Sequence, residues 1–141
     1  MFEVLSFLNE LEDSDISYFL GTGDERQVIS GTVIIQEGIH PDSIYFVLEG
    51  LVGVSASSVD GRQLTTLGPG ELIGEMSFLE DRPASATITA VENSLILALP
   101  RHKLVEKLSE DCAFAARVYK SFASIACRRL RESVSSLGEQ L

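Results

Sequence analysis

The sequence has few of the residues that metal centres and disulfide frameworks require. It contains two histidines and two cysteines in 141 residues, and His40 and His102 lie far apart beside no other histidine or cysteine. We expect no metal site, because zinc needs three or four converging ligands. Cys112 and Cys127 lie fifteen residues apart in one predicted helix, roughly 22 Å along its axis, and cannot bridge each other there. We interpret both as reduced thiols.

Basic residues are scarce in the first part of the chain. Residues 1–40 hold eight acids against Arg26 alone, and the apolar opening MFEVLSFL carries Glu3 where a signal peptide has lysine or arginine. The hydrophobic share of 45% and the charged share of 23% are near globular averages, which favours neither a disordered chain nor a membrane protein. We therefore expect a mature, soluble, cytoplasmic protein with no membrane contact.

The formal net charge is −10, and we interpret the excess of acids as a solvated face. An acidic domain repels phosphate backbones, so direct DNA binding is not expected. Residues 101–141 differ, with eight lysines and arginines against five acids. The basic stretch CRRLRES within this part is predicted to contact an acidic partner or the N-terminal region.

Hydrophobic periodicity divides the chain into helical ends and a β-rich middle. Residues 1–25 are predicted to form two short helices, with a cap around Asp13. Residues 26–100 contain short β-rich runs separated by glycine-rich turns, and Asp60-Gly61 predicts a hairpin turn with positive φ. The eight predicted strands are 26–29, 32–36, 43–49, 51–57, 62–67, 71–74, 85–91 and 94–100. The sequence thus predicts one domain over 1–141, an α+β but mainly β double-stranded β-helix jelly roll.

Residues 101–141 are predicted to form a short helix and a long one. Ser109 is the expected cap of the long helix and Gly138 its expected end. About twenty-eight residues give on the order of 42 Å of helix, more than a domain this small can cover. We expect the apolar stripe of this helix to pair with a second copy in a homodimer, and the alternative is that the stripe packs on its own roll. The stripe consists of Tyr119, Phe122, Ala126, Leu130, Val134 and Leu137.

Two stretches resemble the cyclic nucleotide-binding domain, the sensor module of catabolite activators, protein-kinase regulatory subunits and some ion channels. ISGTVIIQEGIHPDSIYFVLEGLVGVSA, at 29–56, is similar to the glycine-punctuated first half of that family. LGPGELIGEMSFLEDRPASATITAVENSLILALP, at 67–100, is similar to its phosphate-binding cassette. RPASAT also resembles a subgroup of bacterial stand-alone or transporter-fused domains, and 114–138 resembles their long last helix, which forms the dimer in the wider family.

The cassette stretch has a physical reading of its own. Gly74 followed by EMSFL predicts a brief helix whose first amides attract an anion such as a cyclic phosphate. A carboxylate beside that anion, as Glu75 would be, suits hydrogen bonds from a ribose 2′-hydroxyl, which is the role that the resemblance implies. The alternative is a solvated acid at a helix start. The predicted ligand-binding residues are Gly74, Glu75, Met76, Ser77, Arg82, Ala84, Ser85, Ala86 and Thr87.

The cassette departs from the family at its arginine. In the family, an arginine directly before the small residue of the SAT-like triplet binds the cyclic phosphate, and here that position is Ala84. Either Arg82 reaches back around Pro83 to the ligand, or it stays in the loop as a surface residue beside Glu80 and Asp81. The resemblance implies cyclic AMP or cyclic GMP as ligand, and Ala84 argues against both. Losing such a phosphate contact costs on the order of 2–5 kcal/mol.

Three classes of function follow from these observations. The first is a non-enzymatic regulatory or sensor domain that binds a small ligand weakly, or a ligand other than cyclic AMP or GMP, and that acts on an effector protein. The second is a dimerisation or protein-interaction module with a vestigial pocket. An enzyme related to the cupins ranks last, because two histidines do not supply their metal ligands. A transcription factor is not expected either, because the helix-turn-helix that follows the long helix in that branch does not follow here.

Overall fold

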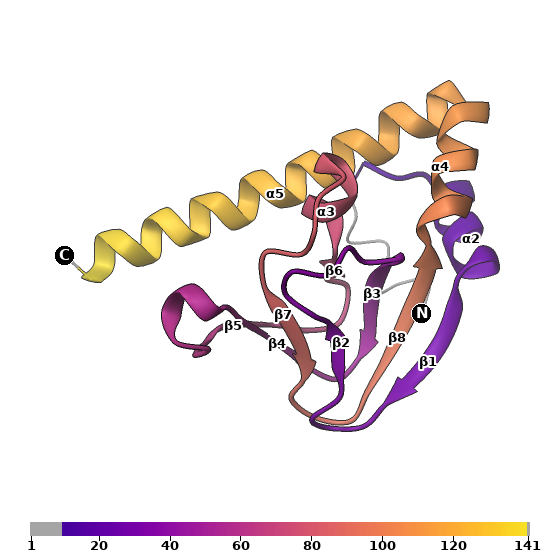
Figure 1. The fold of residues 1–141 in the computed structure, drawn as a ribbon. Coiled ribbons are helices and arrows are strands. Elements are labelled where there is room, and N and C mark those ends of the chain that lie inside the picture. The colour runs from indigo at the N-terminus through magenta and orange to yellow at the C-terminus, as the bar shows by residue number, and fades with distance from the viewer. Residues whose placement is uncertain (1–9, 141) are drawn as a thin grey trace.

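Two antiparallel sheets form a β-roll with helices gathered at one end (Figure 1). This computed structural model describes residues 10–140, with side chains through residue 136. The sheets have the strand orders β1-β8-β3-β6 and β2-β7-β4-β5. The strands are β1 (Asp24–Val28), β2 (Val33–Ile35), β3 (Ser43–Glu49), β4 (Val52–Ser55), β5 (Gln63–Leu67), β6 (Leu72–Ile73), β7 (Thr87–Ala90) and β8 (Ser94–Pro100). The predicted jelly roll of eight strands is confirmed.

Strand β3 shows why the sequence folds in layers. Successive side chains of a strand point to opposite faces. Ile44, Phe46 and Leu48 belong to the core beneath the helices, whereas Tyr45 and Val47 belong to the core between the sheets. Six of the seven residues of β3 are buried, because both of its faces are covered.

The turns lie close to the glycine-rich segments that predicted them, although some element boundaries are shifted. Asp60 and Gly61 have φ of 60° and 71°, as the hairpin prediction requires, and the 3₁₀ helix η1 (Ser57–Val59) precedes them. The roll begins at Asp24, inside the segment 1–25 that was predicted to be helical, because Asp24 pairs with Ala98 of β8. At the β3–β4 turn, Gly50 has φ of 98° and packs directly on Ser94.

Helix α2 (Asp13–Thr22) is the N-terminal helix of the described part. The first of the two predicted N-terminal helices falls largely on residues 1–9, which lie outside the described residues. Asp15 is buried in α2 and accepts two hydrogen bonds from Arg117 of the last helix, at 2.7 and 2.9 Å. The Arg117 guanidinium holds the pKa of Asp15 below its usual value. This ion pair ties the N-terminal helix to the C-terminal one.

The remaining helices are α3 (Glu75–Glu80), α4 (Arg101–Glu110) and α5 (Cys112–Gln140). The predicted cap at Ser109 is wrong: Ser109 lies within α4, and Asp111 caps α5 by accepting a hydrogen bond from the Phe114 amide at 3.0 Å. The predicted end at Gly138 is also wrong, since α5 continues to Gln140. Among the described residues, no helix is both long and apolar enough to cross a membrane.

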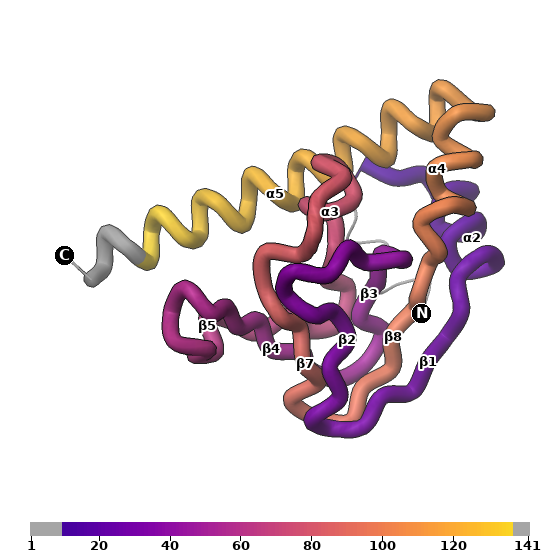
Figure 2. The backbone as a smooth tube through the Cα atoms, in the orientation of Figure 1, coloured from indigo at the N-terminus to yellow at the C-terminus, as the bar shows by residue number. Residues whose placement is uncertain are grey.

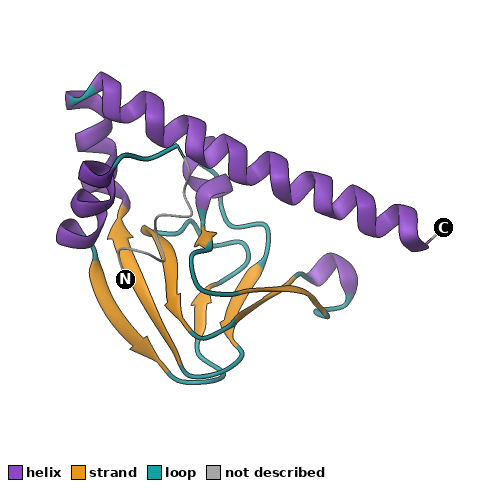
Figure 3. Cartoon of the chain, turned by 180° about the vertical axis from the view of Figure 1, so that it is seen from behind, coloured by secondary structure: helices purple, strands orange, loops and turns teal. Residues whose placement is uncertain are grey.

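Helix α5 crosses the whole molecule and extends beyond the roll (Figures 2 and 3). Its N-terminal half packs on the first sheet and on α3 through residues spaced by three and four. These buried residues are Phe114, Val118, Ser121, Phe122 and Ile125. From Leu130 to Ser136 every side chain is exposed, so the second half of α5 contacts little of its own chain.

Candidate functional site

The predicted cassette helix exists and is short. Gly74 leaves β6 with φ of 93° and precedes α3, a conformation that residues with a Cβ rarely adopt. Phe78 of α3 packs edge-on against the Phe122 ring of α5, with ring centroids 6.0 Å apart. This contact between Phe78 and Phe122 holds α3 beneath α5. In this position the first turn of α3 faces the interior of the roll.

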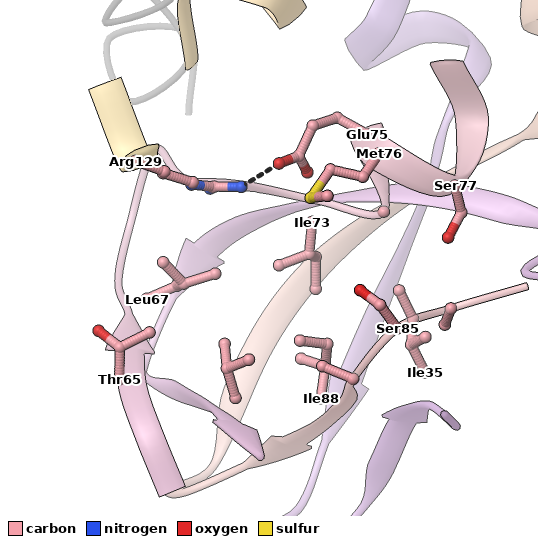
Figure 4. Close-up of a pocket in the computed structure, with 14 residues that line it drawn as sticks. Ile35, Thr65, Leu67, Ile73, Glu75, Met76, Ser77, Ser85, Ile88 and Arg129 are labelled. Atoms are coloured by element: carbon pink, nitrogen blue, oxygen red, sulfur yellow. Dashed lines mark hydrogen bonds and ion pairs between the residues drawn. The ribbon is translucent and has the colours of Figure 1, made fainter. Parts of the chain in front are cut away.

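A cavity of about 200 Å³ opens between the start of α3, the chain that enters β7 and the strands of the second sheet (Figure 4). Fourteen residues line it, and most are apolar. They are Ile35, Val54, Thr65, Leu67, Ile73, Gly74, Glu75, Met76, Ser77, Ala84, Ser85, Ala86, Ile88 and Arg129.

Strand register builds one wall of this cavity. Ile35 of β2 pairs with Ile88 of β7, Ile88 pairs with Val54 of β4, and Val54 pairs with Thr65 of β5. Directly opposed residues of neighbouring strands share a face, so these four form one row across the sheet. Leu67, two residues after Thr65, lies on the same face. The wall is aliphatic apart from the Thr65 hydroxyl.

The charged part of the cavity is an ion pair between distant segments. Glu75 is 4% exposed, and one of its carboxylate oxygens accepts a hydrogen bond from Nη1 of Arg129, on α5 (Figure 4). Nη2 of Arg129 donates to the Leu72 carbonyl at 2.5 Å and to Glu71 at 3.1 Å. Arg128 also donates to Glu71, at 2.9 Å. The segment from Glu71 to the start of α3 is thus connected to α5 by two carboxylates and two guanidinium groups.

The structure brings seven of the nine predicted ligand-binding residues to the cavity. Gly74, Glu75, Met76 and Ser77 line it from the start of α3, and Ala84, Ser85 and Ala86 line it from the chain entering β7. Thr87 is not among the lining residues, since its hydroxyl accepts hydrogen bonds from the Glu37 amide and the Gln36 side chain at 3.1 and 3.3 Å.

Arg82 lies outside the cavity, on the exposed loop after α3. Its amide donates to the Ser77 carbonyl at 3.2 Å. Its neighbour Asp81 forms a hydrogen bond with His40 at 2.7 Å and an ion pair with Arg101 at 3.3 Å. Arg82 is therefore an exposed loop residue. It does not line the cavity, where it would have to lie to replace the arginine missing at position 84.

The predicted stripe on α5 splits between two faces. Phe122 is fully buried in the core of its own chain, so its assignment to a partner-facing stripe is wrong. Tyr119, Leu130 and Val134 are 47%, 66% and 59% exposed, and Ala126 is half-buried. The side chain of Leu137 lies outside the described residues.

Sequence reasoning missed Arg129 and the aliphatic wall. The basic stretch CRRLRES was predicted to contact an acidic partner or the N-terminal region, but Arg128 and Arg129 pair with Glu71 and Glu75 of their own chain. The N-terminal region is instead paired with Arg117, which lies earlier on α5. The wall was visible as alternating apolar residues in the predicted strands, but which of them meet depends on the register.

Known proteins resemble this chain over most of its length. A Thermus thermophilus protein described as a cyclic AMP receptor protein is 34% identical over 86% of this chain and 53% of its own length. Glutaminase 2 of Bradyrhizobium diazoefficiens is 30% identical over 89% of this chain, which is 20% of that enzyme. The chain therefore spans about half or less of these two relatives.

In the part of the chain that the structure describes, no three histidine, cysteine or acidic residues are grouped as a metal site would need.

Solved structures show the same fold. The crystal structure of a cyclic nucleotide-binding domain from Methylobacillus flagellatus matches with a TM-score of 0.88 at 22% identity, covering 99% of this chain and 84% of that one. The family model described as the cyclic nucleotide-binding domain matches residues 25–111. That range holds both the roll and the whole cassette stretch around the cavity. The chain therefore belongs to the cyclic nucleotide-binding domain family.

Proposed function

We propose that this chain is a non-enzymatic regulatory domain that binds a small ligand in the cavity beside α3 and passes the binding event to α5. The proposal rests on the ion pair between Glu75 and Arg129. The Glu75 carboxylate lines the cavity and also binds Arg129 of α5, so a ligand that contacts this carboxylate affects α5 directly. The name of the Thermus relative, a cyclic AMP receptor protein, supports a sensing role for the fold. The cytoplasmic location stays a prediction.

The ion pair gives the proposal a mechanism. A ligand that hydrogen-bonds to Glu75 competes with Arg129 for the same carboxylate, whereas a ligand that leaves the pair intact strengthens the contact between α3 and α5. In either case the ligand interacts differently with two positions of α5, and this difference in binding free energy shifts their populations. The part of α5 that would carry this change to an effector is the exposed segment from Leu130 to Ser136.

The absence of arginine at Ala84 sets the expected affinity. A charge-assisted phosphate contact accounts for about 2–5 kcal/mol, and its loss weakens binding roughly thirtyfold to several-thousandfold. We therefore propose that cyclic AMP and cyclic GMP bind weakly here, or that the physiological ligand is a different small molecule.

Calorimetry tests this function directly. The full chain is titrated with cyclic AMP, cyclic GMP and cyclic dinucleotides, beside the variant Ser85→Trp, which places a large ring at the cavity mouth, and Ser58→Trp, which changes an exposed serine in η1. We expect weak binding by the parent and by Ser58→Trp, and none by Ser85→Trp. Equal binding by all three proteins would place the ligand elsewhere on the molecule.

A second proposal is that the chain acts as a dimerisation module, as the exposed Leu130 and Val134 on the extending half of α5 favour. These residues are four apart and share one face of the helix. Light scattering after size exclusion should give a dimer for the parent and for Ser135→Glu, and a monomer for Leu130→Glu with Val134→Glu. A parent that stays monomeric at high concentration contradicts this proposal without affecting the ligand site.

A further inference from the structure

The charged groups of the cavity neutralise each other within the protein. Among the described lining residues, Glu75 and Arg129 are the two that carry charge. Both terminal nitrogens of Arg129 already donate, to Glu75, Glu71 and the Leu72 carbonyl. Its remaining nitrogen, Nε, is buried away from solvent with no hydrogen-bond partner, so a molecule in the cavity does not reach it. These three bonds use three of the five N–H groups of Arg129, and its positive charge is balanced by the Glu75 and Glu71 carboxylates rather than left for a ligand.

The rest of the lining suits an uncharged molecule. The apolar part of the lining includes Ile35, Val54, Leu67, Ile73 and Ile88, which offer an incoming phosphate no compensation for lost water. Neutral hydroxyl groups complete the lining, and in Figure 4 the Ser77 and Ser85 side chains project toward the same space. A hydroxyl donates one hydrogen bond and accepts two, which matches sugar hydroxyls and the edges of neutral heterocycles.

The volume restricts the size of the ligand. An apolar cavity of about 150 Å³ holds benzene, so the 200 Å³ found here is large enough for one or two rings. Met76 at the mouth is 54% exposed, and its flexible side chain leaves room for a substituent that extends toward solvent.

We propose that the cavity binds an uncharged, ring-containing molecule of nucleoside size in preference to its phosphate-bearing counterpart. This inference rests on the proposed function, because it assumes that the cavity is a ligand site. It follows from the alanine at position 84, where the resemblance implies an arginine, together with the pairing of the Arg129 charge with Glu75 and Glu71 inside the protein. Ligand charge is thus the property by which this site discriminates.

Adenosine and cyclic AMP test the proposal, since they differ by one charged cyclic phosphate. Both are titrated calorimetrically into the full chain at 50 and 500 mM NaCl. We expect adenosine to bind at least as tightly as cyclic AMP, with little change between the two salt concentrations, because screening affects charge interactions and not apolar contacts.

Restoring a cation should reverse the preference. Ala84→Arg places a guanidinium in the lining, and Ser85→Arg does so from an exposed rim position should the buried site at Ala84 not tolerate the larger side chain. Ser58→Arg, at an exposed residue of η1, is the charge-matched control. We expect either cavity variant to improve cyclic AMP over adenosine at least tenfold and to make that gain sensitive to salt, and we expect no such change from the control.

Two results overturn the inference in different ways. If the parent protein binds cyclic AMP ten times more tightly than adenosine, or more, the preference for an uncharged ligand is refuted while the proposed ligand site stands. If neither compound binds to the parent or to either arginine variant, the inference is refuted, and the proposed function is refuted with it only when cyclic GMP and the cyclic dinucleotides do not bind either.

Discussion

Replacing Arg129 with methionine should destabilise the protein strongly, although the residue lies on a helix whose next turn is exposed. The substitution removes the partner of Glu75, whose side chain is 5% exposed, and leaves a buried carboxylate without a counter-charge. Removing one member of a buried pair costs about 3–5 kcal/mol. Because the Arg129 side chain is 23% exposed and water enters more easily after truncation, we expect the lower end, about 3 kcal/mol.

The measurement is urea unfolding followed by far-UV circular dichroism. With a denaturant slope of about 2 kcal/mol/M, a loss of 3 kcal/mol lowers the unfolding midpoint by roughly 1.5 M. Arg131→Met is the matched control, because Arg131 is exposed on the same helix and forms no ion pair with the described residues. We expect the control to change stability by less than about 0.5 kcal/mol.

A double-mutant cycle separates the pair from the rest of the site. Glu75→Gln removes the charge but keeps an amide oxygen that accepts from Arg129, so it should cost about 1–2 kcal/mol. The double variant should lose less than the sum of the two single losses, since no buried charge remains, with a coupling energy of about 2 kcal/mol. If Arg129→Met and Arg131→Met unfold at the same urea concentration, the ion pair does not contribute to stability and the link between the cavity and α5 is refuted.

Two further substitutions test the link between α2 and α5 and the turn between β3 and β4. Asp15→Asn should cost about 1–2 kcal/mol at pH 7, because the amide keeps one oxygen acceptor for Arg117 but loses the charge of the buried carboxylate. Because the pKa of Asp15 is lowered in the folded state, the contribution of its carboxylate is present above the unfolded-state pKa and is lost as pH falls through the folded-state pKa. Urea unfolding from pH 7 to pH 2 should show the two proteins converging in acid, and a constant difference contradicts the assignment. Gly50→Ala should lower the melting temperature far more than Gly31→Ala: both have positive φ, but a Cβ at Gly50 lies 2.7 Å from the Ser94 Cα atom, whereas nothing lies within 4 Å at Gly31. If both variants lower the melting temperature equally, the positive φ accounts for the whole loss and the contact with Ser94 does not contribute.

Local chemistry was enough to predict the strands and the cassette helix. The continuous apolar run in SIYFVLE, the positive-φ residues Asp60 and Gly61, and the glycine before EMSFL each act over a few neighbouring residues, and the structure follows them. Helix ends were predicted less well. Ser109 and Asp111 are both good capping residues, but the Ser109 hydroxyl donates to the Glu106 carbonyl within α4, and Asp111 accepts from the Phe114 amide at the start of α5.

The sequence by itself determined the β-roll, the brief helix after Gly74 and the absence of an arginine at Ala84, because each depends on residue type and short-range spacing. Only the tertiary structure decided that Arg129, 54 residues from Glu75, reaches its carboxylate, and that Ile35, Ile88, Val54 and Thr65 form one wall. The physical reason is that helix direction and strand register are set by how whole elements pack, and a register shift of one residue would turn every one of these side chains to the other face.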